Sequence, residues 1–175
     1  MDFERVLRTL TKFFNENDLK WGVIGGLAMA AHGVPRTTLD VDIVVNGEIQ
    51  ERLVVFLESK GFRTLHRSTG YSNHLHDDPD LGRIDVVYVR GDTSHKIFGN
   101  AKAHPGPGGT EIPVPRVEHI AAMKAYSIKN DPSRTLRELA DIRMLLDGPG
   151  VDRAEVNTYF VRYGLEELID RLDEH

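Results

Sequence analysis

A short apolar segment of this chain carries two acids where a buried strand should carry none. Residues 39–45 read Leu-Asp-Val-Asp-Ile-Val-Val, and this alternation predicts a β-strand whose apolar side chains, from Leu39 onward, are buried. Side chains two apart on a strand share a face, so Asp40 and Asp42 are expected side by side. Adjacent carboxylates repel each other unless they share a proton or a cation, and a divalent metal ion is therefore their expected partner.

A third acid interrupts another apolar segment. Residues 83–90 predict a strand on which Ile84, Val86 and Tyr88 share one face, which leaves Asp85 on the other. If this strand pairs beside residues 39–45, Asp85 joins the first two aspartates. Three converging carboxylates can hold two Mg²⁺ or Mn²⁺ ions about 3.5–4 Å apart, an arrangement used for phosphoryl or nucleotidyl displacement. The structural alternative is that the acids are merely solvated at strand ends.

A Gly-Gly turn precedes the first acidic strand. Gly25 and Gly26 end a predicted buried strand at 21–24 and open a helix of small residues that runs to about 31. Glycine lets the backbone approach a phosphate, and the start of a helix presents N–H groups to an anion. Most Gly-Gly pairs mark only a tight turn. A phosphate-binding role is indicated here because the aspartates follow in the sequence.

The remaining pattern predicts a mixed α/β half followed by helices. We expect a catalytic core over 1–114 and a helical subdomain packed on it over 115–175, with a mobile loop at 99–110 and a cleft between the two parts. The other predicted helices span 3–16, 48–59, 116–129, 133–147, 152–162 and 165–173, and further strands span 62–66, 71–76 and 111–114.

Composition excludes several classes of protein. The chain has no cysteine, which rules out disulfides and thiol catalysis, and its net charge of −5 argues against a dedicated nucleic-acid-binding module. No apolar run approaches the roughly 20 residues that span a bilayer, and the N-terminus lacks signal-peptide features. We therefore expect a cytoplasmic protein that does not associate with membranes.

The three motifs, in this order and spacing, resemble the DNA polymerase beta-like nucleotidyltransferase superfamily. The segments concerned are 23–26, 40–43 and 84–86, and residues 36–42 are similar to small bacterial members that include AbiEii-like toxins of toxin–antitoxin pairs. The resemblance implies a mixed sheet flanked by helices, with a C-terminal helical subdomain. It also implies transfer of a nucleoside monophosphate from an NTP to a hydroxyl or phosphate acceptor.

The resemblance also implies roles for single residues. Asp40 and Asp42 would bind both metal ions, and Asp85 would complete one metal shell and assist deprotonation of the acceptor. Gly25 and Gly26 would hold the triphosphate.

Two cations extend the implied nucleotide site. Arg36 would reach phosphate or an acidic loop, with a surface arginine as the alternative. Lys124 interrupts an apolar helical stripe and would contact the triphosphate, with a lysine at the edge of the stripe as the alternative. Glu138 stands where relatives carry an aspartate, and Asp141 is expected to orient Lys124 or Arg137 rather than bind metal.

Several questions stay open at this level. The candidate acceptors are RNA such as a tRNA end, a protein, or a small molecule such as an aminoglycoside or lincosamide, and an antitoxin is a candidate partner. A catalytically silent nucleotide- or partner-binding module and a Mg²⁺-dependent phosphohydrolase are the competing functions. His74, His76 and Asp78 have a spacing that could bind zinc, although solvated loop residues are the more common meaning of that pattern.

Overall fold

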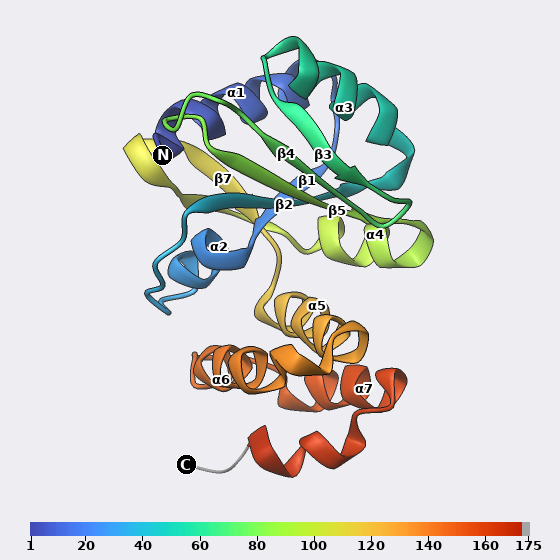
Figure 1. Cartoon of the computed structure of the whole chain (residues 1–175). Coiled ribbons are helices and arrows are strands. Elements are labelled where there is room, and N and C mark those ends of the chain that lie inside the picture. The colour runs from blue at the N-terminus through green and yellow to red at the C-terminus, as the bar shows by residue number, and fades with distance from the viewer. Residues whose placement is uncertain (173–175) are drawn as a thin grey trace. The chain divides into compact units, whose positions relative to one another are not determined.

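The computed structural model describes residues 1–172, which form two compact units (Figure 1). The first comprises residues 1–31 and 35–115, and the second comprises residues 32–34 together with the chain from Arg116 onward. The expected division at 114/115 into two domains stays a prediction, and its last three residues lie outside the described part of the chain.

A mixed five-stranded sheet forms the centre of the first unit. Its spatial order is β1-β2-β5-β4-β3, with β2 and β5 parallel and the other neighbours antiparallel. The strands are β1 (Trp21–Ile24), β2 (Asp40–Asn46), β3 (Arg63–Arg67), β4 (Tyr71–Leu75) and β5 (Arg83–Val89). The order brings two strands that are far apart in the sequence, β2 and β5, into direct contact.

The sheet buries one face under α1 (Phe3–Glu16) and α3 (Gln50–Ser59). Apolar residues at helical spacing on α1 meet the buried residues of β2 and β5, because alternate strand residues point to this face. The main contributors are Leu7, Leu10, Phe14, Val41, Ile43, Leu53, Leu57, Ile84 and Val86. The opposite face, on the side of α2 (Gly25–Ala31) and α4 (Gly91–Gly99), is therefore the one that carries the acids.

The second unit is helical. It contains α5 (Val117–Asn130), α6 (Thr135–Leu146) and α7 (Arg153–Tyr163), followed by two short 3₁₀ turns at Glu166–Leu168 and Asp170–Leu172. Its own core is built from residues on all three helices, among them Ala125, Ile142 and Phe160. The helix predicted over 165–173 is wrong over its described part, where these two single turns replace it.

Two further predictions are corrected by the structure. The segment 99–110 is not simply a loop, since β6 (Lys102–Pro105) pairs with β7 (Glu111–Val114) and the Pro- and Gly-rich residues form only the turn between them. Leu39 is 83% exposed and precedes β2 rather than belonging to it. The helix α4 was not predicted, because Gly91–Gly99 has only two fully buried positions and little periodicity.

The predicted fold class is confirmed: a mixed sheet flanked by helices, followed by a helical segment. Within residues 1–172, every helix is too short or too polar to cross a bilayer.

Candidate active site

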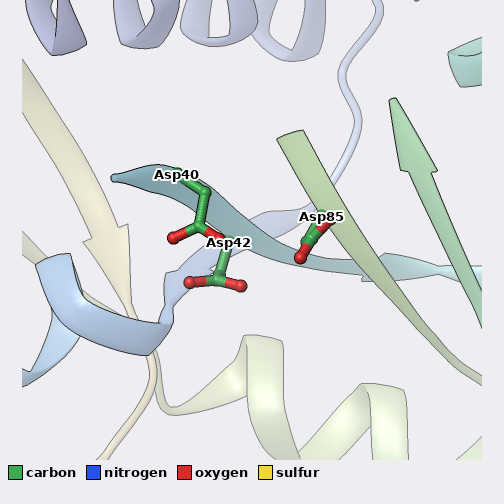
Figure 2. Close-up of side chains that lie close together, drawn as sticks. All are labelled: Asp40, Asp42 and Asp85. Carbon is green, nitrogen blue, oxygen red and sulfur yellow. The ribbon is translucent and has the colours of Figure 1, made fainter. Parts of the chain in front are cut away.

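Backbone pairing brings the three predicted acids together. Asp42 on β2 and Asp85 on β5 are direct partners in the parallel register, and Asp40 lies two residues before Asp42 on the same face. Figure 2 shows the carboxylates of Asp40 and Asp42 projecting to the same side of β2, with Asp85 on the neighbouring strand. The sequence hypothesis that the two acidic strands pair is thus confirmed.

The carboxylates suit a divalent cation. One oxygen from each of Asp40, Asp42 and Asp85 lies within 4.8 Å of the other two. Hard oxygen donors at this separation match the preference of Mg²⁺ and Mn²⁺. Among the residues that the structure describes, no other group of three acidic or histidine side chains meets this test.

Two of the acids are oriented by neighbours. The Thr38 hydroxyl donates to Oδ1 of Asp40 over 2.9 Å, which ties the loop before β2 to the first residue of that strand. Arg83 Nε donates to Oδ1 of Asp85 over 2.7 Å, and the Asp85 side chain is only 14% exposed. The hydrogen bond to Asp85 raises the pKa of Arg83, so the guanidinium stays charged.

The Gly-Gly turn packs directly on the acidic strand. Gly25 has φ +62°, and a Cβ there would overlap Oδ2 of Asp42. A Cβ on Gly26 would lie 2.6 Å from Cβ of Thr38. Close packing against these two residues is a sufficient reason for both glycines. Their predicted contact with a triphosphate stays a prediction.

The strand β4 adds polar groups beside Asp85. Asn73 is the direct antiparallel partner of Asp85, so its side chain stands on the same face. Two residues earlier, the Tyr71 hydroxyl accepts a hydrogen bond from Arg83 Nη2 over 3.3 Å. Burial raises the pKa of Tyr71, and the negative charge of Asp85 raises it further, whereas Arg83 lowers it. Because the net effect is a raised pKa, the phenol is neutral at pH 7.

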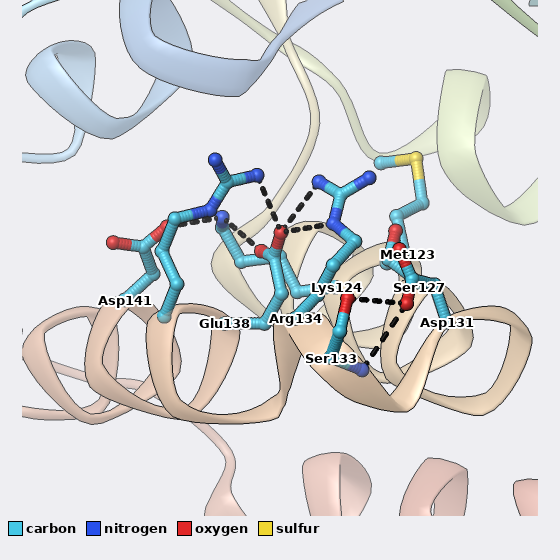
Figure 3. Close-up of polar contacts among 9 residues, drawn as sticks. Met123, Lys124, Ser127, Asp131, Ser133, Arg134, Glu138 and Asp141 are labelled. Atoms are coloured by element: carbon cyan, nitrogen blue, oxygen red, sulfur yellow. Dashed lines mark hydrogen bonds and ion pairs between the residues drawn. The ribbon is translucent and has the colours of Figure 1, made fainter.

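Lys124 lies in the second unit within a buried ionic network (Figure 3). Its Nζ donates to Oε2 of Glu138 over 2.8 Å and to Oδ2 of Asp141 over 2.6 Å. Asp141 therefore orients Lys124, as predicted. Arg36 is half-buried in the connection between α2 and β2, four residues before Asp40.

Glu138 connects this network to two arginines. Its Oε1 accepts from Arg134 Nη2 over 2.6 Å and from Arg137 Nη2 over 3.2 Å. Burial alone would raise the pKa of Glu138, but the charges of Lys124 and Arg134 outweigh it and lower the pKa to about 2. Lys124, Arg134 and Arg137 thus all contact Glu138, and Lys124 also contacts Asp141.

His74 is part of a buried chain of hydrogen bonds on the other face of the sheet. Its Nδ1 lies 3.1 Å from the Thr64 hydroxyl and its Nε2 lies 2.8 Å from the Ser72 hydroxyl, which in turn contacts the Tyr88 hydroxyl over 2.7 Å. His76 Nδ1 accepts from the backbone N–H of Asp78. These partners give both histidines structural roles, and the zinc interpretation receives no support within the described residues.

Arg83, Tyr71 and Asn73 are site residues that the sequence reasoning missed. The signal was present: residues 71–76 were predicted as a strand, but paired only with the preceding strand and not with 83–90. Placing the same strand beside β5 as well puts alternate residues of β4 next to Asp85.

Comparison with solved structures identifies the class of fold. The antibiotic-resistance factor ANT(2'')-Ia, in its solution structure, matches with a TM-score of 0.70 at 16% identity, over 98% of this chain and 97% of its own. Its crystal structure with adenylyl-2''-tobramycin matches with a TM-score of 0.68 at 16% identity, over 91% and 95%. The lincomycin-bound lincosamide antibiotic adenylyltransferase LnuA matches with a TM-score of 0.53 at 15% identity, over 81% and 95%.

This chain therefore has the nucleotidyltransferase fold. No family model and no curated protein sequence matches it.

Proposed function

We propose that this protein is a metal-dependent nucleotidyltransferase that moves a nucleoside monophosphate from an NTP to a hydroxyl group. The observation that carries this proposal is the convergence of Asp40, Asp42 and Asp85 within 4.8 Å, on two adjacent strands of a nucleotidyltransferase fold. A structural role alone would not collect three acids at one point of a sheet, since their mutual repulsion opposes folding.

Asp40 and Asp42 would hold Mg²⁺ or Mn²⁺ jointly, with Asp85 as the third ligand. The cation would supply positive charge for the triphosphate and a lower pKa for the acceptor hydroxyl. The acceptor oxygen then attacks the α-phosphorus, the bond from that phosphorus to the bridging oxygen breaks, and pyrophosphate leaves. Asp85 takes the proton of the acceptor hydroxyl, while Arg83 orients its carboxylate.

On the nucleotide side, we propose triphosphate contacts for Gly25, Gly26 and Arg36 of the first unit. Lys124 stays the proposed phosphate-binding residue of the second unit. The proposal for Lys124 is supported by the three cationic side chains that gather at Glu138, because ammonium and guanidinium groups bind phosphate. Because Glu138 and Asp141 hold the ammonium in place, little side-chain entropy is lost when it meets an anion.

For the acceptor, we propose a small molecule with several hydroxyl and amino groups. ANT(2'')-Ia has been solved with adenylyl-2''-tobramycin, and it matches this chain over nearly the full length of both. The net charge of −5 favours a cationic acceptor over RNA. An AbiEii-like toxin acting on RNA or protein, with an antitoxin partner, is the competing outcome.

The test is transfer of label from each α-labelled NTP with Mg²⁺ or Mn²⁺. Tobramycin, lincomycin, total bacterial RNA and a protein extract would serve as acceptor probes, with Asp40→Asn/Asp42→Asn as the inactive control. Label in an antibiotic that is lost in the control supports the proposal, whereas label in RNA or protein supports the toxin-like function.

Two other results would point elsewhere. Release of phosphate or pyrophosphate without label transfer would indicate a phosphohydrolase. Nucleotide binding without turnover on any probe would indicate a catalytically silent module.

A further inference from the structure

The amide oxygen of Asn73 is buried beside the acidic site without a hydrogen-bond partner. Among the described residues, its Oδ1 is one of four buried side-chain atoms in this condition. A buried acceptor without a donor costs a protein on the order of 1–3 kcal/mol, so native structures rarely keep one without a compensating use.

The position of this oxygen indicates its use. Asn73 and Asp85 are direct partners across β4 and β5, and such partners have Cβ atoms roughly 4.5–5.5 Å apart on one face. The neighbouring residues of β4, Ser72 and His74, point to the opposite face, where both are fully buried and hydrogen-bonded. Asn73 therefore stands on the Asp85 side, on the strand next to the one that carries the expected proton acceptor.

We propose that Asn73 positions the acceptor substrate, with its Oδ1 accepting a hydrogen bond from a hydroxyl or ammonium group next to the attacking oxygen. This inference rests on the proposed transferase function and deepens it, because it names the residue that selects the acceptor. The neutral hydroxyl of Tyr71, two residues away on the same face, supplies a second polar group. A donor-rich acceptor, such as an aminoglycoside, satisfies the buried oxygen, and an acceptor that lacks the donor does not.

The donors of Arg83 beside Asp85 are engaged, since its Nε is directed to Asp85 and its Nη2 to Tyr71. A donor that arrives with the substrate would give the buried Asn73 oxygen a partner. Such a site discriminates strongly, since loss of one hydrogen bond to a buried polar group leaves that group uncompensated.

The experiment compares Asn73→Leu, which has the same branching and the same number of side-chain heavy atoms but is apolar, with Asn73→Ala. Ser72→Ala is the matched control, since it lies one residue away and faces the opposite side of the sheet. We would measure the KM for tobramycin, the KM for ATP and kcat with α-labelled ATP, and the Tm of each ligand-free protein.

In Asn73→Leu and Asn73→Ala we expect the KM for tobramycin to rise about 10-fold or more, and the KM for ATP to stay within 2-fold. The Tm of Asn73→Leu should rise by roughly 2–4 °C, because the unpaired buried oxygen is gone. Ser72→Ala should lower the Tm and leave both KM values unchanged.

An unchanged KM for tobramycin in a folded, active variant would overturn the proposal. So would equal rises in both KM values, or a fall in the Tm of Asn73→Leu, each of which indicates a structural role. If the wild-type protein labels neither tobramycin nor any other probe, the proposed function has failed. The Tm comparison then decides about Asn73 alone: a rise supports an oxygen kept unpaired for a ligand, and a fall contradicts it.

Discussion

Asp42 and Asp85 are direct partners across parallel strands, although 42 residues separate them in the chain. Two like charges in this position would weaken a sheet by themselves. Arg83 offsets part of this repulsion by its hydrogen bond to Asp85, while Asp40 and Asp42 stand together at the start of β2. The arrangement thus keeps three acids close enough for a shared cation.

The packing of Gly25 on Asp42 should make alanine costly at this position. Gly25→Ala combines a left-handed backbone with overlap at the Asp42 carboxylate, and we expect it to lower the free energy of unfolding by about 3 kcal/mol. Gly91→Ala is the control, since Gly91 has a similar φ of +55° with open space around it, and about 1 kcal/mol is expected there. Urea unfolding measures both, and equal losses would contradict the close contact with Asp42.

The ion pair between Arg83 and Asp85 should oppose cation binding. Arg83→Met removes one positive charge from the site, so we expect Mn²⁺ to bind about 3- to 10-fold more tightly in calorimetric titration. Arg63→Met is the matched control, because Arg63 pairs with the exposed Asp77 on the edge of the sheet. Weaker Mn²⁺ binding in Arg83→Met would show that Arg83 mainly orients Asp85.

The low pKa of Glu138 should appear as pH-dependent stability. The pKa of Glu138 is about 2 in the folded protein, against an ordinary value of 4.5 in the unfolded chain. The charged carboxylate therefore stabilises the fold above about pH 4.5. This contribution is lost as the pH falls toward 2. Glu138→Gln should therefore cost about 3 kcal/mol at pH 7 and progressively less below pH 4.5. Unfolding curves recorded from pH 7 to 2.5 measure this loss of stability. Glu167→Gln, at an exposed position, is the control, and it should change neither the free energy of unfolding nor its slope against pH.

The buried His74 should destabilise the protein in mild acid. Burial lowers the pKa of His74 in the folded state, so below pH 6.5 the unfolded chain binds a proton that the folded protein does not. We expect stability to fall as the pH drops below about 6.5, by at most about 1.4 kcal/mol per pH unit from this residue. His74→Gln should flatten that slope, and the exposed His66→Gln should not; identical slopes in the two variants would exclude His74 as the cause.

Much of the fold was readable because its signals are local. A hydrophobic period of 3.6 or 2 residues predicts the apolar stripe of α1, the small-residue helix after Gly25 and the two acidic strands. The structure places these elements within one or two residues of the predicted bounds. The strand β6 and the 3₁₀ turns near the end were missed, since their sequences carry no such period.

The candidate site shows the same division. Strand alternation was enough to predict that Asp40 and Asp42 share a face, because it is a property of the backbone itself. Asp85 was expected to join them on the condition that its strand pairs beside residues 39–45, and the structure shows this pairing. Arg83 lies two residues before Asp85 on the same strand, so alternation alone puts both side chains on one face. Tyr71 and Asn73 lie beside Asp85 only because β4 is next to β5, and strand order is decided by which faces bury best together.

The sequence by itself thus determined most of the elements, the fold class and the shared face of Asp40 and Asp42, because these depend on spacing along one strand or helix. Tertiary structure alone decided that Gly25 packs against Asp42, that Lys124 is held by Glu138 and Asp141, and that Asn73 faces the acidic site. Those relationships join residues between 12 and 17 positions apart, and they exist only once the burial of apolar surface has brought their elements together.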